Sequence, residues 1–380
     1  MPCFDRTDET KALWRQFQNG RNLLMLAPRR IGKTVLLNHL RESAAAQGFR
    51  AIVLDVEGLR DEKAFFRECC AAIQEELSTG TKVMSAFAHR LSGLLRGQGD
   101  ADTDGDWRQW LGRTDWPEFA DQLFAHLDDH HEALPWLILI DELPVFVNAL
   151  QERGGATAIR EFLYWLRGMR QKHRRIRWLY TGSIGLDTIA RRNQVEGALN
   201  DLEPFTLGPF DAATARAFLA DVARRRGCTL ADGAADCILN RLGWRSPYYL
   251  ERIAEDACGR VGADRTVDTV SANLAMDRLL ELDKRLYWAS WREHLDRNFT
   301  EPDRSRLYLV LETVAKADDG ANGSLLLGVL NQRGEPIAEL ALRDLVDTLL
   351  ADGYLVLGTD GRYRFMMHLL REWWLRYVVL

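Results

Sequence analysis

The stretch that most constrains the fold of this chain is residues 22–40, NLLMLAPRRIGKTVLLNHL. An apolar run is followed by a short loop with two arginines, then by Gly-Lys-Thr and a second apolar run. We expect a buried parallel strand at 23–26 and a helix from Lys33 onward. A loop between such elements presents backbone N–H groups and the positive end of a helix dipole to an anion.

The loop itself fits a phosphate-binding sequence, with alanine in place of the first glycine. Gly32 lets the backbone approach a phosphate, Lys33 is expected to reach the β- and γ-phosphates, and the Thr34 hydroxyl is expected to hold Mg²⁺. The alternative is a chance loop of small and basic residues, which the flanking strand and helix make the weaker interpretation. The predicted nucleotide-binding residues here are Ala27, Pro28, Arg29, Arg30, Ile31, Gly32, Lys33, Thr34 and Val35.

A second apolar run, WLILI at 136–140, ends in two acids. Ligands in open α/β sheets bind at the carboxyl ends of the strands. Asp141 is therefore the predicted Mg²⁺ ligand, and Glu142 the catalytic group that orients the attacking water. Without further evidence, the pair would be interpreted as solvated acids at the end of a strand. Together with the phosphate-binding sequence upstream, a metal-binding and catalytic pair becomes the favoured interpretation.

Two further runs complete the predicted sheet. The run at 176–186 carries Thr181 or Ser183 as the polar residue that contacts the γ-phosphate or the water, with Ser183 also readable as a helix N-cap. The run at 49–59 ends near Asp55 and Glu57, which are more plausible as structural groups than as catalytic ones. We expect helices at 34–46, 62–77, 117–131 and 156–173, an edge strand at 205–210, and a parallel sheet covered on both faces.

Composition excludes few classes of protein. The 380 residues carry a net charge of −5 and 47% hydrophobic residues, which suits a globular chain of two or three domains. The six cysteines form no C-x-x-C pair, the N-terminus is charged, and the apolar runs are too short to span a bilayer. These features predict a cytoplasmic protein with reduced thiols and no membrane partner.

Three segments have an unusual balance of charged residues. The stretch 335–352 contains five acids and one arginine, which argues against insertion in a DNA groove. The stretch 167–177 has six Lys or Arg and no acid, and a solvated helix end is favoured over a nucleic-acid patch. The stretch 100–106 opens like a calcium loop but lacks its closing glutamate at Leu111, so it reads as an acidic surface loop.

The motifs PRRIGKT, LILIDE and YTGS resemble the archaeal-type P-loop ATPases, which are related to the STAND switches and more distantly to AAA+ proteins. The opening Phe4-Asp5-Arg6, the exit segment 198–211, the segment 242–257 with Gly243 and Pro247, and the closing segment 365–377 are similar to theirs. The resemblance implies a sheet order of 5-1-4-3-2, adenine as the base, and Pro247 as a nucleotide contact. It also implies an arginine finger, for which Arg192 is the named candidate beside Arg191, Arg29 and Arg30.

Domain boundaries and function follow from both kinds of argument. We predict an α/β P-loop ATPase core at 1–210, a helical lid at 211–298 and a winged helix at 299–380, read as three helices and a hairpin with Asp360-Gly361 at its turn. The predicted function is a Mg²⁺-dependent ATPase switch that couples its ATP state to a protein partner, DNA-associated or not. The alternative is a DNA-binding regulator or nucleotide-gated scaffold with little turnover. Nucleic acid is not the favoured partner, and a homo-oligomer is left open.

Overall fold

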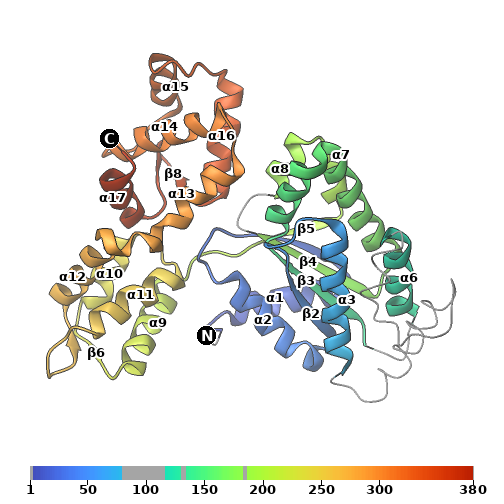
Figure 1. Ribbon diagram of the computed structural model, residues 1–380. Helices are drawn as coiled ribbons and strands as arrows, with labels where there is room; N and C mark the ends of the chain where they lie inside the picture. Colours follow the sequence, from blue (N-terminus) through green and yellow to red (C-terminus); the bar gives the residue numbers. More distant parts are fainter. Residues whose placement is uncertain (1–2, 79–115, 130–133, 183–185, 380) are drawn as a thin grey trace. The chain divides into compact units, whose positions relative to one another are not determined.

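The computed structural model describes residues 3–78, 116–129, 134–182 and 186–379. The chain forms two compact units (Figure 1). Unit 1 comprises Met1–Leu26 and Lys33–Thr206, and unit 2 comprises Ala27–Gly32 and Leu207–Leu380. The loop Ala27–Gly32 thus belongs to unit 2, although the chain on either side of it belongs to unit 1. The predicted acidic loop at 100–106 lies outside the described residues.

The described part of unit 1 contains a five-stranded parallel sheet in the order β2-β3-β4-β1-β5. Read from its other edge, this is the predicted order 5-1-4-3-2, so the predicted sheet is confirmed. Because β4 lies between β1 and β3, the strand before the loop and the strand before the acids are not neighbours. The strands are β1 (Asn22–Leu26), β2 (Arg50–Asp55), β3 (Trp136–Asp141), β4 (Ile176–Gly182) and β5 (Leu202–Thr206).

Helices cover both faces of this sheet, as Figure 1 shows. One face packs against α3, α6 and α7 through a core rich in aromatic side chains, including Phe65, Phe124, Phe162 and Trp178. Every residue of β3 is buried, as expected for a central strand covered on both sides. The helices are α1 (Thr7–Gln18), α2 (Lys33–Ser43), α3 (Glu62–Ser78), α6 (Trp116–Asp129), α7 (Leu143–Lys172) and α8 (Leu186–Arg192).

One predicted boundary was wrong, and one helix was not predicted. The helix expected at 156–173 is confirmed as the second half of α7, which follows a break in the helix at Gly155, where φ is 67°. The unpredicted helix is the first half of α7, which begins at Leu143. Pro144 in the first turn suits a helix start and is the sequence signal for this boundary. The edge strand expected at 205–210 is β5, which ends at Thr206, because Leu207 and Phe210 are buried in unit 2 instead.

The basic stretch 167–177 contributes to the interior of unit 1. Arg170 is buried, and its guanidinium donates to both carboxylate oxygens of Asp201, to the Tyr180 hydroxyl and to the Ala198 carbonyl. Lys172 pairs with Asp121 at 2.9 Å. Arg170 is therefore a structural residue, whereas Lys172 and Arg174 are exposed, and the preference for a solvated helix end over a nucleic-acid patch stays a prediction. Arg170 also ties α7 to the segment that leads into β5.

Unit 2 is largely helical. A pair of short parallel strands, β6 (Thr229–Leu230) and β7 (Thr266–Val267), joins the first helices of the unit. Its helices are α9 (Ala212–Arg225), α10 (Ala234–Leu242), α11 (Pro247–Cys258), α12 (Thr269–Leu279), α13 (Leu286–Asn298), α14 (Asp303–Lys316), α15 (Gly323–Gln332), α16 (Glu339–Ala351) and α17 (His368–Tyr377).

The last segment of unit 2 has the element order expected from its sequence. Three helices, α14 to α16, are followed by an antiparallel hairpin of β8 (Leu355–Leu357) and β9 (Tyr363–Phe365). Asp360 and Gly361 lie between these strands, and Ala321 adds an isolated bridge to Tyr363. The term winged helix for this segment, and a boundary at residue 298, stay predictions.

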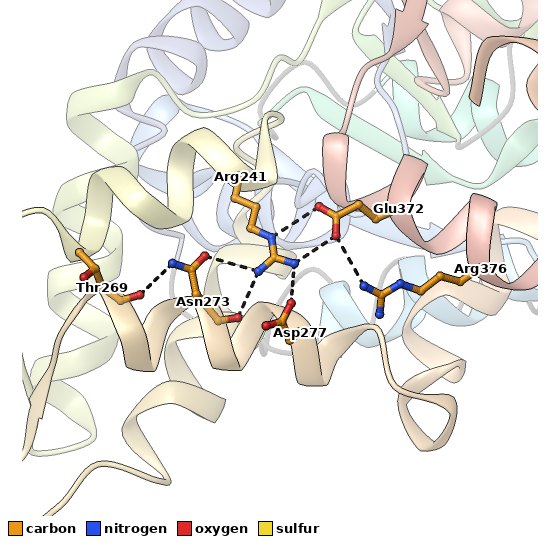
Figure 2. Close-up of polar contacts among 6 residues, drawn as sticks. All are labelled: Arg241, Thr269, Asn273, Asp277, Glu372 and Arg376. Atoms are coloured by element: carbon orange, nitrogen blue, oxygen red, sulfur yellow. Dashed lines mark hydrogen bonds and ion pairs between the residues drawn. The ribbon is translucent and has the colours of Figure 1, made fainter. Parts of the chain in front are cut away.

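A charged cluster connects α10 and α12 to the final helix, α17 (Figure 2). Arg241 on α10 donates to Asp277 on α12 at 2.6 Å and to Glu372 on α17 at 3.1 Å. The same guanidinium reaches the Asn273 carbonyl at 3.3 Å. Nearby, the Trp288 and Trp373 rings stack with centroids 6.2 Å apart. These contacts explain why residues 207–380 form one unit.

Two observations concern the predicted reduced thiols and the predicted lack of a membrane-spanning segment. All six cysteines lie in the described part and are free thiols. Within that part, no helix has the length and apolar character needed to cross a membrane.

The Arg170 cluster gives a first test. We expect Arg170→Met to lower the free energy of unfolding by about 3–5 kcal/mol, because the change leaves the Asp201 carboxylate without its buried partner. Urea denaturation followed by circular dichroism measures this. Arg174→Met is the matched control, since Arg174 is exposed, and it should change stability by less than about 0.5 kcal/mol. Equal effects of the two variants would contradict a structural role for Arg170.

Candidate functional site

The structure brings the two sequence signals of unit 1 together. The Thr34 hydroxyl, in the first turn of α2, donates to Asp141 Oδ2 at 2.6 Å. Asp141 is the last residue of β3, so the start of α2 and the end of β3 meet through these two side chains. This placement is the one that the sequence analysis requires of a hydroxyl and a carboxylate that share a Mg²⁺ ion.

Charge is concentrated around this contact. Lys33 and Asp141 are 7% and 4% exposed, respectively. Burial raises the pKa of Asp141, and the Glu142 and Asp55 carboxylates raise that pKa further, whereas the Thr34 hydrogen bond and the Lys33 ammonium lower it. A buried carboxylate that resists ionisation gains from a nearby cation. The site therefore favours the arrival of positive charge beside Asp141.

Glu142 occupies a strained position directly after β3. Its φ is 57°, in the left-handed region that a residue with a β-carbon seldom adopts. Its carbonyl accepts hydrogen bonds from the amides of Val145 and Phe146, which start α7. Asp141 Oδ1 accepts from the Glu142 amide at 3.1 Å. This strained turn fixes the direction in which the Glu142 side chain leaves the strand.

Gly182, the last residue of β4, lies against that turn. A β-carbon at Gly182 would lie 2.3 Å from Pro144 Cδ and 3.6 Å from Glu142 Oε2. Only glycine fits there, and its hydrogen lets the tip of β4 approach the Glu142 carboxylate. Nothing in the sequence around Gly182 marks it as constrained, because the constraint comes from Pro144, which is distant along the chain.

Thr181 is the polar residue of β4 that the structure places at this edge of the sheet. It is fully buried, and its hydroxyl has no hydrogen-bond partner in the described part of the chain. It pairs with Met25, next to the end of β1. A buried hydroxyl without a partner is rare in native proteins and is expected to be satisfied by a ligand or water. Ser183, the other candidate, lies outside the described residues.

The loop Ala27–Gly32 has the backbone expected of an anion-binding turn. Arg30 and Gly32 have φ values of 64° and 93°. A β-carbon at Gly32 would meet no atom within 4 Å, so open space remains on that side. Alternating backbone conformations of this kind can direct successive N–H groups toward one anion. The loop residues therefore fit a phosphate group.

The donor set also fits Mg²⁺. Within the described ranges, no cluster of three or more His, Cys, Asp or Glu could hold a metal ion by itself. Magnesium is commonly held by one or two protein oxygens together with substrate phosphates and water. Thr34 Oγ1 and the Asp141 carboxylate, the two predicted Mg²⁺ ligands, are two such oxygens.

The other predicted residues lie as follows. Val35 is half-buried in the first turn of α2, and Asp55 ends β2 beside Asp141 in the register, where it accepts from the Glu57 amide. Arg192 is exposed at the end of α8, and Pro247 starts α11 in unit 2. The roles predicted for Arg192 and Pro247 stay predictions.

Gly182 allows a test that needs no ligand. We expect Gly182→Ala to lower the free energy of unfolding by about 1–3 kcal/mol, because the new methyl overlaps Pro144. Gly168→Ala is the control, since Gly168 lies in α7 with open space around it and alanine there should stabilise by about 0.5–1 kcal/mol. Urea titration distinguishes the signs. A neutral or stabilising Gly182→Ala would contradict the close approach of β4 to Pro144.

The raised pKa of Asp141 predicts a pH-dependent stability in the absence of metal. Asp141→Asn should raise the melting temperature near neutral pH, and about 1 kcal/mol corresponds to roughly 2–4 °C for a unit of this size. The cost of the ionised carboxylate is full above the raised pKa and is lost as the pH falls through it toward 3.8. The gain should therefore shrink as the pH falls toward 3.8. A gain that grows on acidification would show the opposite pKa shift.

The chain was compared with known families and structures. A family model described as an AAA-like domain matches residues 5–96. No curated protein matches the sequence. Among solved structures, the Walker-type ATPase PABY2304 of Pyrococcus abyssi is 19% identical, with a TM-score of 0.65 over 98% of this chain and 95% of that one.

A second solved structure is the ORC2 protein of Aeropyrum pernix, in ADPNP-ADP complexes. It is 13% identical, with a TM-score of 0.56 over 99% of this chain and 95% of that one. Likeness at these identities concerns the fold. Together with the strand order and the loop after β1, it shows that this chain has the α/β fold of the P-loop NTPases and supports its resemblance to the archaeal-type ATPases.

Proposed function

We propose that this protein binds ATP with Mg²⁺, hydrolyses it, and passes the change of nucleotide state to a protein partner. The observation that carries the proposal is the contact between Thr34 and Asp141, at 2.6 Å, beside the buried Lys33. A loop of small and basic residues without a function is not expected to bring a hydroxyl and an ammonium at the start of α2 next to a carboxylate at the end of β3. The ATPase fold of PABY2304 and the nucleotides named with ORC2 support the same assignment.

The binding roles follow from the charges of the residues. The amides of the loop Ala27–Gly32 and the Lys33 ammonium are suited to the phosphates. Thr34 and Asp141 would hold Mg²⁺, which neutralises charge that develops on the phosphate oxygens when it is bound. Thr181 offers a buried hydroxyl donor at the tip of β4. Adenine as the base is inferred from the resemblance alone.

Hydrolysis is assigned to Glu142. Its position after β3 is fixed by the turn into α7, and Gly182 leaves its carboxylate room beside β4. A carboxylate held in this way can orient a water molecule and accept its hydrogen bond during attack on the terminal phosphate. Ser183 and Arg192 remain candidates for contacts to the γ-phosphate, Arg192 as an arginine finger.

The partner is proposed to be a protein. On α16, the exposed residues include Glu339, Asp344 and Asp347 beside a single arginine, Arg343. Such a surface repels the phosphate backbone of DNA. The alternative of a DNA-binding regulator with little turnover therefore has less support, and salt-dependent duplex binding by the purified protein would restore it.

Two substitutions test the proposal together. Lys33→Ala should abolish Mg²⁺-dependent binding of a fluorescent ATP analogue. Glu142→Gln should retain binding but lower the hydrolysis rate by a factor of about 10²–10⁴, which is typical for loss of a general base. Steady-state phosphate release measures turnover, and circular dichroism confirms that both variants are folded.

Each outcome has a distinct meaning. Equal turnover by the wild type and Glu142→Gln would overturn the catalytic assignment while leaving binding intact. Unchanged nucleotide affinity in Lys33→Ala would overturn the binding site itself. Because turnover can require a partner, the binding measurement decides the site when the isolated protein is silent.

A further inference from the structure

Arg30 is the loop residue with the least favourable backbone. Its φ of 64° lies in the left-handed region, where a non-glycine residue is held only by its surroundings. The carbonyl of Arg30 accepts a hydrogen bond from the Ser246 hydroxyl at 2.5 Å. Both residues belong to unit 2, as the loop is part of that unit. The contact therefore restrains the strained peptide directly.

Ser246 makes this contact in place of its usual local role. It is the N-cap of α11 and precedes Pro247 at the first helical position, yet its side chain makes no capping hydrogen bond. Serine at an N-cap ordinarily accepts from an amide of the first turn. Ser246 is completely buried and directs its hydroxyl to the loop instead.

The side chain of Arg30 is held by two further groups. Its guanidinium carbon lies 4.3 Å from the centre of the Tyr248 ring, within the range of a cation–π contact. Its Nη2 also donates to Ser290 Oγ at 3.4 Å. Tyr248 lies in the first turn of α11 and Ser290 in α13, so the same arginine is held at its backbone by one residue and at its tip by two.

A second set of contacts holds the preceding loop residues. Arg29 Nε donates to His294 Nδ1 at 3.3 Å, and His294 Nε2 lies 2.8 Å from Asp352 Oδ2. Since Nδ1 accepts, the ring proton belongs on Nε2, where it is donated to Asp352. Gly353 packs against Pro28, where a β-carbon would come within 2.7 Å of Pro28 Cβ. Three consecutive loop residues thus have partners from three parts of unit 2: the start of α11, α13, and the turn that follows α16.

We propose that Ser246 and Tyr248, aided by the His294–Asp352 pair, are positioning residues for the phosphate-binding loop. They hold Arg30 in the left-handed conformation that directs the loop amides to a phosphate. The expected effect of these residues on phosphate affinity rests on the proposed function. By linkage, a rearrangement of unit 2 that breaks these contacts lowers phosphate affinity, and phosphate binding favours the arrangement that keeps them.

The test first measures amide exchange in the loop without a ligand and then measures nucleotide binding. Hydrogen–deuterium exchange of the amides at 29–33 is followed in the nucleotide-free full chain, for the wild type and Ser246→Ala. Loss of one ordinary hydrogen bond should speed exchange by roughly three- to tenfold and weaken binding of a fluorescent ATP analogue with Mg²⁺ by a similar factor. Ser324→Ala is the matched control, because Ser324 is exposed in unit 2, and it should change neither quantity.

Tyr248 provides an independent pair of variants. Tyr248→Phe keeps the ring and should behave like the wild type, whereas Tyr248→Leu should speed loop exchange and weaken binding. If Ser246→Ala and Tyr248→Leu leave both exchange and affinity unchanged, the positioning role is wrong. If the wild type binds no nucleotide, the proposed function fails, and loop exchange still decides whether these residues position the loop.

Discussion

The hydrogen bond between Thr34 and Asp141 is the contact around which the proposed nucleotide site is built. It connects the start of α2, the helix that follows β1, to the end of β3, and β4 separates β1 from β3 in the sheet. The bond also partly offsets the unfavourable burial of the Asp141 carboxylate, which is otherwise surrounded by further negative charge. A site that holds a carboxylate at this cost is suited to a cation, and the anion-binding loop before Thr34 supplies the matching half.

Backbone strain is concentrated where this chemistry is expected. Arg30 and Glu142 both have positive φ values, one within the loop and one directly after β3. Each is held by its neighbours: Arg30 through Ser246, and Glu142 through the first turn of α7. Strain of this kind persists only where the surroundings determine the conformation, and it is common at ligand sites. The glycine at the tip of β4 belongs to the same arrangement, because any side chain there would displace Pro144.

Much of unit 1 could be predicted from its sequence, because buried parallel strands read as short apolar runs. The run at 136–140 predicted β3, and Thr34 and Asp141, which the sequence assigned to one Mg²⁺ site, are in contact, although their role stays a prediction. The sequence could not reveal Gly182 or Ser246 as constrained positions. Their constraints come from Pro144 and Arg30, which are distant along the chain, and a serine before Pro247 reads as an ordinary helix cap. The early start of α7 was missed because its apolar first turns resemble a continuation of the strand.

The most direct test of the central claim is a crystal structure of the protein with a non-hydrolysable ATP analogue and Mg²⁺. The account predicts the triphosphate within hydrogen-bonding distance of the loop amides and Lys33, and the metal bound to Thr34 Oγ1 with Asp141 beside it. A saturating analogue bound elsewhere, or a metal that contacts neither Thr34 nor Asp141, would contradict it.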